Sequence, residues 1–161
     1  MAKNDLVVAW LNDAYAMENS IIEVLEKQVD LASDHPAIQS GIQRHLDQTR
    51  GHAETVKSCL SQLGESPSGI KSGLASIGGK LQGAAMGAAK DDLVKAALQD
   101  YSTEHMEIAS YKALILATQE IGEPTLGESL KEVLAEEEAM AQWLDSQLPA
   151  IVREAVTQGE T

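Results

Sequence analysis

The sequence predicts an all-α protein, a four-helix bundle made of two helical hairpins joined by one long crossover. Apolar residues recur every three or four positions, as at Val7, Leu11 and Ala14, and few windows alternate strictly between polar and apolar residues. Turn and helix-stopping residues divide the chain into four long helical segments, at about 4–31, 36–63, 91–120 and 124–148. At 161 residues with 43% hydrophobic content, we expect residues 1–161 to form a single domain.

The ends of the first two helices are marked by local signals. After the segment 4–31, Asp34, His35 and Pro36 supply an N-cap and a first-turn proline for the next helix. Gly64 then favours a stop after about residue 63. The short turn between the two segments predicts that they pack as an antiparallel hairpin.

The second pair of helices has similar signals. Asp91 and Asp92 suit the positively polarised start of the third helix, and Gly122 marks its end. Pro124 opens the fourth helix. Pro149 is expected to end or kink that helix, because proline lacks a backbone N–H and its ring clashes with the preceding turn.

The link between the two hairpins, about 64–90, is rich in glycine, alanine and serine. A connection of this length is unusual unless it crosses the bundle, and two hairpins joined by one crossover are the ferritin-like arrangement. Within the link, apolar residues at helical spacing predict a short helix that caps one end of the bundle: Ile70, Leu74, Ile77 and Leu81. A loop or a partner-binding segment is the alternative.

Composition excludes several classes of partner. The formal net charge is -13, and no Lys/Arg cluster could follow a phosphate backbone or an anionic lipid surface. We therefore expect neither nucleic acid nor a membrane as a partner. Cys59 is the only cysteine, so no intramolecular disulfide can form, and neither a signal peptide nor a membrane span is recognised. These features predict a protein of the reducing cytoplasm.

Each predicted helix carries a polar interruption in its apolar stripe, close to the middle of the helix. Glu18 lies on the stripe of the first helix and Thr49 on that of the second. Glu104 and Glu107 share the inward face of the third helix, and Glu137 lies on that of the fourth. Because antiparallel helices of similar length meet at their midpoints, these residues should converge at one level of the bundle.

Such a cluster predicts a metal centre. Ionised carboxylates are very costly to bury without partners, and four glutamates carry the charge that two divalent cations balance. Carboxylates and imidazoles without a cysteine suit iron or manganese better than structural zinc. The predicted metal ligands are Glu18, His52, Glu104, Glu107 and Glu137, and further residues are alternative ligands or neighbours of the ligands: His45, Thr49, His105 and Glu138.

Two choices within this set stay open. His45 and His52 lie two turns apart, roughly 10 Å along the helix axis, which is too far for both to bind one ion easily. We select His52 as the ligand and leave His45 as a neighbouring donor or a core histidine. In the fourth helix Glu136, Glu137 and Glu138 compete, and the helical period selects Glu137.

Four segments resemble a known family. The stretch EHMEIASY, residues 104–111, resembles the E-H-Y-E-x-x-x-Y segment of rubrerythrin-type ferritin-like proteins, and more closely the EHYEIAAY of the YciE/YciF family of bacterial ferritin-like proteins. The stretches AMENSIIEVL, HLDQTRGHAETV and VLAEEEAMAQWL resemble the corresponding first, second and fourth helices. The resemblance covers all four helices and is weakest in the crossover.

The resemblance implies a di-iron carboxylate centre held by Glu18, Glu104, Glu107 and Glu137. The rubrerythrin-type pattern also has Glu-x-x-His on the second and fourth helices. Here Thr49 stands in place of the first glutamate and Met140 in place of the second histidine. One bridging carboxylate and one histidine of a symmetric centre are thus absent from their usual positions.

The functional hypothesis is a ferroxidase-type stress protein that binds two iron ions, or manganese, and oxidises Fe(II) with O2 or peroxide. The chain lacks the cysteine pairs of a rubredoxin electron-transfer module. The alternative is a non-catalytic, stress-associated helical bundle that acts through a partner. A homodimer is the expected assembly, because the short tail after Pro149 leaves little room for the fifth helix of cage-forming ferritins.

Overall fold

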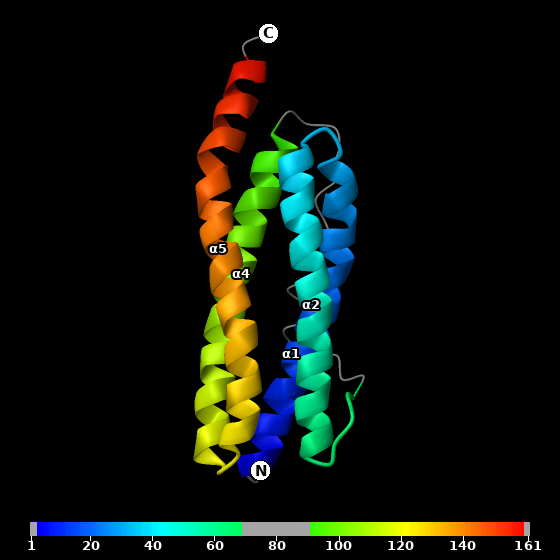
Figure 1. Cartoon of the computed structure of the whole chain (residues 1–161), viewed down its shortest axis with the longest axis vertical. Coiled ribbons are helices and arrows are strands. Elements are labelled where there is room, and N and C mark those ends of the chain that lie inside the picture. The colour runs from blue at the N-terminus through cyan, green and yellow to red at the C-terminus, as the bar shows by residue number, and fades with distance from the viewer. Residues whose placement is uncertain (1–2, 69–90, 160–161) are drawn as a thin grey trace.

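The computed structural model describes residues 3–68 and 91–159, and within these ranges the protein consists of four long α-helices without strands (Figure 1). The predicted all-α class is confirmed. The helices are α1 (Lys3–Leu31), α2 (Pro36–Gln62), α4 (Asp92–Glu120) and α5 (Pro124–Gly159). The predicted capping helix over 70–81 lies outside the described residues.

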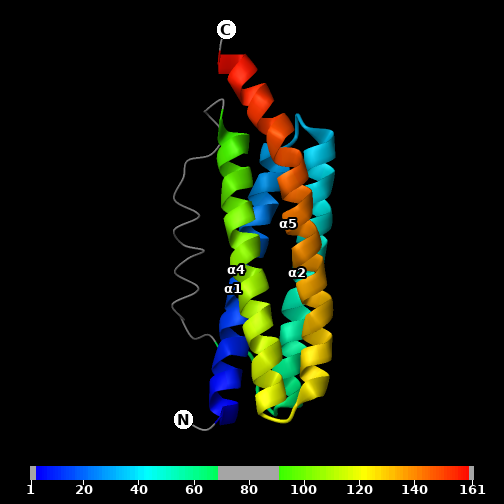
Figure 2. The ribbon, with the colours of Figure 1, turned by 90° about the vertical axis from the view of Figure 1, so that its left-hand side faces the viewer.

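The four helices form two antiparallel hairpins that lie side by side. Packing is most extensive between α1 and α2 and between α4 and α5, and the two hairpins meet along α1–α4 and α2–α5. Figures 1 and 2 show both pairs running the length of the bundle. One buried hydrogen bond crosses between the hairpins, from Gln28 Nε2 on α1 to Asp100 Oδ1 on α4 at 2.7 Å. This is the ferritin-like bundle that the sequence predicts.

Helices α2 and α4 end at the glycines that predict their ends. Gly64 has φ 79° and Gly122 has φ 83°, the left-handed region that favours glycine. After α2, Glu65 N–H donates to Leu60 O at 2.9 Å, and after α4, Glu123 N–H donates to Thr118 O at 2.9 Å. These are Schellman motifs, which satisfy the last carbonyl groups of each helix.

The start of α2 lies where the sequence predicts it. Of the residues named there, His35 is the N-cap, without a side-chain capping bond. Pro36 occupies the first turn, as predicted, where its missing N–H costs no intrahelical hydrogen bond. The proline therefore fixes the start of α2 without help from a side-chain cap.

The end of α5 contradicts the predicted boundary. Instead of stopping near residue 148, α5 continues through Pro149 to Gly159, and Figure 2 shows its last turns leaning away from the line of its first part. Pro149 is exposed whereas Ile151 is buried. The carbonyl freed by the proline can therefore be solvated, and the apolar contact of Ile151 stabilises the turns beyond it.

Apolar layers enclose the polar residues at mid-height. On α1, Leu11 and Ala14 precede Glu18, and Ile21 and Leu25 follow it, all buried. On the other helices, buried apolar residues likewise lie before or after the polar ones: Ile42, Val56, Leu60, Leu114, Leu130 and Leu144. Glu18, Glu104, Glu107 and Glu137 are all buried, and Glu137 lies close both to Glu18 and to the two glutamates of α4, as expected of residues that meet at one level of the bundle.

Substitution by alanine should have opposite effects on stability at two glycines of α2. Gly41 is buried against the ring of Trp143, which an added methyl group would overlap, whereas Gly51 is exposed and has no side chain within 4 Å of a methyl group. We expect Gly41→Ala to lower the free energy of unfolding by about 1–3 kcal/mol through overpacking. Gly51→Ala should raise it by about 0.4–1 kcal/mol because alanine restricts the unfolded chain. Urea unfolding of both variants checks this, and equal effects would contradict it.

Candidate metal centre

Every helix of the bundle contributes to one buried polar cluster. Glu18 comes from α1, His45 and His52 from α2, Glu104 and Glu107 from α4, and Glu137 from α5. None of these side chains is more than 3% exposed. The helical period places each residue on the inward stripe of its helix, so the cluster follows from the local sequence pattern of each helix.

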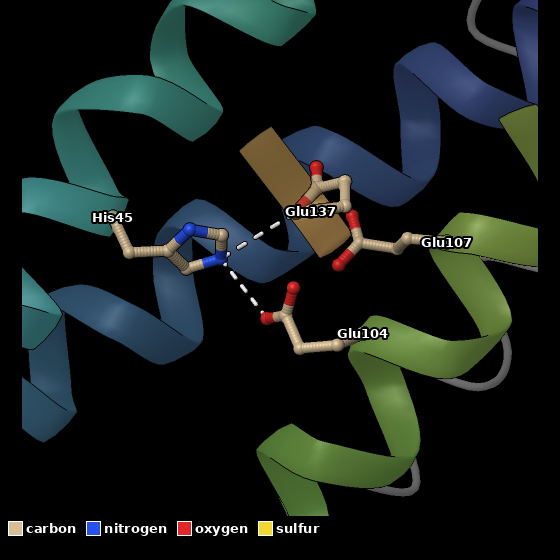
Figure 3. A group of neighbouring side chains, drawn as sticks. All are labelled: His45, Glu104, Glu107 and Glu137. Atoms are coloured by element: carbon tan, nitrogen blue, oxygen red, sulfur yellow. Dashed lines mark ion pairs between the residues drawn. The ribbon is translucent and has the colours of Figure 1, made fainter. Parts of the chain in front are cut away.

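The first of two groups within the cluster contains His45, Glu104, Glu107 and Glu137, whose potential ligand atoms all lie within 4.8 Å of one another. Figure 3 shows the imidazole of His45 facing the three carboxylates. His45 Nε2 lies 3.0 Å from Glu104 Oε1 and 3.9 Å from Glu137 Oε2. One imidazole nitrogen and three carboxylates thus converge on one point.

The second group contains Glu18, His52 and Glu137, again within 4.8 Å. His52 Nδ1 lies 2.8 Å from Glu137 Oε1 and 3.9 Å from Glu18 Oε2. Glu137 belongs to both groups, with Oε2 toward His45 and Oε1 toward His52. The two groups are therefore adjacent, and one carboxylate joins them.

The donor atoms of the cluster fit a metal better than they fit one another. Both oxygens of Glu107 and of Glu137 are buried without a hydrogen-bond partner, as are Oε2 of Glu18 and Oε2 of Glu104. His45 lacks a partner on both nitrogens, and His52 lacks one on Nδ1. Buried polar atoms are normally satisfied, and a concentration of exceptions at one place requires a ligand. Carboxylates and imidazoles are the donors that iron and manganese prefer.

Crowding of buried carboxyl groups raises three of their pKa values. Burial, together with the charge of Glu137, raises the pKa of Glu18 to about 8, despite the opposing effects of His52 and Tyr111. Burial and Glu137 also raise the pKa values of Glu104 and Glu107 well above their ordinary value. With a pKa of about 8, Glu18 is mainly protonated at neutral pH when no cation is bound. The raised pKa values of Glu104 and Glu107 favour their protonated forms.

The pKa values of the other three groups, Glu137, His52 and His45, do not all shift in the same direction. Burial would raise the pKa of Glu137, but the close contact with the charged ring of His52 outweighs it and lowers the pKa. In the same way, burial would lower the pKa of His52, but its contacts with the carboxylates of Glu137 and Glu136 raise it to about 9. Burial lowers the pKa of His45 to about 4, so that this imidazole is neutral. Without a cation, the cluster therefore contains one ion pair, His52 with Glu137.

Two hydroxyl groups donate hydrogen bonds to residues of the cluster. Thr49 Oγ1 donates to His45 O within α2 at 2.9 Å, so the threonine that replaces the usual glutamate of the second helix bonds to its own backbone. Tyr111 O–H donates to Glu18 Oε1, which leaves Oε2 of Glu18 directed toward His52. Tyr111 has no exposed surface, and its hydrogen bond restricts the rotamer of Glu18.

Tyr111→Phe should therefore destabilise the metal-free protein. The substitution leaves Glu18 Oε1 buried without a donor, which costs about 1–3 kcal/mol of the free energy of unfolding. Urea unfolding at pH 7 measures this loss. Tyr101→Phe is the control, because the Tyr101 ring contacts His105 at the surface of α4. An equal loss in both variants would contradict the assigned role of the Tyr111 hydroxyl.

Glu136 also contacts the cluster, although its position beside Glu137 on the helix predicts a solvated side chain. His52 Nε2 lies 2.7 Å from Glu136 Oε2, while its Nδ1 faces Glu137. Consecutive glutamates of α5 thus contact opposite edges of one imidazole ring. Glu136 is 45% exposed and Glu137 is fully buried, which agrees with the selection of Glu137 by helical period.

Two of the alternative residues lie outside the cluster. His105 is exposed and contacts the Tyr101 ring edge-on, with ring centroids 4.7 Å apart. Glu138 is 44% exposed and pairs with Lys112 Nζ at 3.0 Å. Neither residue belongs to the groups that could hold a metal. His45, by contrast, lies within the first group, together with three of the predicted ligands.

A four-helix bundle with a carboxylate and histidine cluster from all four helices defines the class of ferritin-like proteins. The chain belongs to the family described as "Domain of unknown function (DUF892)", whose model matches residues 2–157. Its similarity to protein YciF of Escherichia coli strain K12 is 28% identity over 145 residues, covering 84% of this chain and 83% of YciF. The resemblance to the YciE/YciF family is thereby confirmed.

Solved structures support the same fold. The E. coli stress protein YciF superposes with a TM-score of 0.82 at 20% identity, covering 95% of this chain and 98% of YciF. A protein of Xanthomonas campestris pv. campestris has a TM-score of 0.84 at 28% identity and 99% coverage of both chains. A ferritin-like diiron-carboxylate protein of Bacillus anthracis has a TM-score of 0.70 at 18% identity, covering 92% of this chain and 99% of that one.

Among residues 3–68 and 91–159, none of the helices combines the length and apolar character needed to cross a membrane.

Proposed function

We propose that the cluster binds two iron ions and that the protein oxidises Fe(II) with O2 or peroxide. The observation that supports this most is the sharing of Glu137 between two adjacent donor groups, one on the His45 side and one on the His52 side. A carboxylate that faces two groups at once is the arrangement expected of a bridging ligand in a two-metal site.

The donor set gives the two positions different environments. The first has three carboxylates and His45, and the second has two carboxylates and His52, with Glu137 counted in both. Together the four glutamates supply four negative charges once their protons are released, which two divalent cations neutralise. His45 supplies an imidazole from α2, which offsets the absence of a histidine at Met140.

A bound pair of iron ions would supply one electron each, so that one O2 is reduced to peroxide, or one peroxide to water, with uptake of two protons. The residues of the chain set the conditions for this reaction. Apolar layers above and below the cluster separate it from the two ends of the bundle. Tyr111 holds Glu18 by its Oε1 and leaves its Oε2 available.

Binding should release protons. In the metal-free protein at neutral pH, Glu18 carries a proton because its pKa is about 8, and His52 is charged because its pKa is about 9. The raised pKa values of Glu104 and Glu107 also favour their protonated forms. A divalent cation binds only the deprotonated forms of these groups. Metal affinity should therefore rise as the pH rises from 6 to 8.

The experiment that tests the proposal is elemental analysis after anaerobic loading with Fe(II), followed by an optical spectrum on addition of oxygen. We expect close to two iron ions per wild-type chain and an oxo-bridged absorption after oxidation. Glu104→Ala should lose iron from the first position. A wild-type chain that binds no iron would overturn the proposal and favour a non-catalytic bundle that acts through a partner.

A further inference from the structure

A groove of about 900 Å³ runs along the surface of α2, and residues from the first half of α5 also line it. Most of the residues that line it have polar side chains, and they include Gln43, Asp47 and His52 of α2, with Glu132 and Glu136 of α5. Among these, His52 is buried, with 3% of its side chain exposed. The groove therefore reaches from solvent to a residue of the buried cluster.

The inner end of the groove is the contact between Glu136 and His52. Glu136 Oε2 lies 2.7 Å from His52 Nε2, and the carboxylate is 45% exposed. On the other edge of the same ring, Nδ1 lies 2.8 Å from Glu137 Oε1 and has no hydrogen-bond partner of good geometry. One imidazole thus separates an exposed carboxylate from the buried carboxylates that lack partners.

Charge in the groove favours a cation at this end. Glu132 and Glu136 lie one helical turn apart on α5, and both line the groove. The basic residue that lines it, Arg44, lies two turns from His52 along α2. Arg50 does not line the groove, and it pairs with Glu26 at 2.9 Å and with the groove residue Asp47 at 3.2 Å. Acidic side chains in a concave site raise the local concentration of cations.

Gly51 keeps the groove open beside His52. It lines the groove, and a Cβ at this position would have no side chain within 4 Å. Ten residues earlier, Gly41 serves the opposite purpose, because it lets α2 approach the ring of Trp143 on α5. The same pair of helices is thus closely packed at one level and open at the level of the cluster.

We propose that hydrated divalent cations reach the metal centre through this groove and that Glu136 is their last surface ligand before His52. The proposal rests on the proposed function, since it requires a metal at the cluster. A cation bound by Glu136 competes with the bond between that carboxylate and His52 Nε2. Its arrival therefore frees the imidazole ring to turn and let the cation pass to Glu18 and Glu137.

The test measures the rate of metal uptake separately from the amount of metal bound. Anaerobic Co(II) is the probe, with its visible absorption followed by stopped flow and its final stoichiometry by elemental analysis. Gly51→Leu places a side chain in the groove, at a position where an added Cβ meets nothing within 4 Å. Leucine also has a higher helix propensity than glycine, so the fold should be retained. Gly51→Ala is the control that changes the backbone preference and leaves the groove open.

A second variant tests the carboxylate. Glu136→Gln removes the charge at the inner end of the groove. Glu138→Gln is the matched control, because Glu138 is a similarly exposed glutamate two residues away that pairs with Lys112. We expect Gly51→Leu and Glu136→Gln to slow uptake about tenfold, which is within the range attributed to electrostatic focusing and access, whereas both controls load at the wild-type rate. All five proteins should reach the same final stoichiometry.

The two proposals fail in different ways. If the wild-type chain binds two Co(II) ions and Gly51→Leu loads as fast as wild type, the groove is not the route, and the metal centre stands. If Glu136→Gln alone loads at the wild-type rate, the assignment of Glu136 as the last surface ligand is wrong. If the wild-type chain binds no Co(II) and no Fe(II), the proposed function fails, and the uptake route fails with it.

Discussion

Glu137→Gln is expected to abolish metal binding at both positions of the cluster, whereas Glu107→Gln should weaken only the first. Glu137 is the residue common to the two donor groups, and Glu107 belongs to the first group alone. Loss of a residue that merely supports a ligand costs about 10–100-fold in metal affinity, and loss of a shared ligand should cost more than that at each position.

Anaerobic titration with Co(II), with stoichiometry from elemental analysis, measures both variants. We expect two ions per wild-type chain, about one for Glu107→Gln and none for Glu137→Gln. Both substitutions replace a fully buried carboxylate by an amide of the same shape, so the comparison is matched for burial and size. Equal losses in the two variants would show that Glu137 does not bridge the positions.

Glu107→Met is expected to stabilise the metal-free protein by about 1–3 kcal/mol in the free energy of unfolding, which is the cost of burying a polar group without a hydrogen bond. Glu107 has no exposed surface, and neither of its carboxyl oxygens has a hydrogen-bond partner. Methionine fills a similar volume without polar oxygens. Urea unfolding in the presence of a chelator measures the gain, and Glu138→Met at the surface is the control.

The gain should depend on pH in a defined direction. Burial and Glu137 raise the folded-state pKa of Glu107 well above its ordinary value of 4.5. A carboxyl group of this kind favours the folded state fully below pH 4.5, and this contribution is lost as the pH rises toward the folded-state pKa. The advantage of Glu107→Met over wild type should therefore increase between pH 5 and pH 8.

Bound metal should make the wild-type protein more stable than Glu107→Met, which is the reverse of their order without metal. A ligand that binds only the folded state stabilises it by about 2.7 kcal/mol at a concentration one hundred times its dissociation constant. The wild-type chain gains this from each ion, and Glu107→Met loses it at the first position. If Glu107→Met were less stable than wild type both with and without metal, Glu107 would serve the fold rather than a ligand.

The burial of the polar residues and their common level along the bundle axis could be predicted from the sequence, because both depend only on helix periodicity and length. Glu18, Glu104, Glu107 and Glu137 each lie near the middle of a long helix, and antiparallel packing brings such positions together. The exposed charge of Glu138 and the burial of Glu137 follow from the same 3.6-residue period. These features require no knowledge of side-chain conformation.

The roles within the cluster could not be predicted in the same way. Whether His45 or His52 faces the carboxylates depends on rotamers and on the crossing of α2 over α4 and α5, and the structure brings both histidines to the cluster, on different sides of Glu137. Glu136 was missed because its position off the apolar stripe indicates a solvated face. Its contact with His52 exists only because that ring spans the gap between the core and the groove.

The helix beyond Pro149 shows a further limit. Proline is a strong local signal for the end of a helix, but its cost depends on whether the freed carbonyl is solvated, and that is a property of the assembled bundle. Here Pro149 faces water while Ile151 packs against the bundle. Tertiary burial of one side chain outweighs the local preference, because helix stability in proteins comes mainly from packing.

The arrangement of the two hairpins has a consequence for the order in which the molecule opens. Contacts are extensive within each hairpin and sparser between them, and the carboxylates of α1 face those of α4 and α5 across the boundary. In the metal-free protein this boundary is where crowded acidic groups meet. Native proteins open in cooperative units at their least stable boundaries. A metal bound by residues of both hairpins would join these two units, so that the same ions that react at the centre would also determine whether the bundle opens as halves or as a whole.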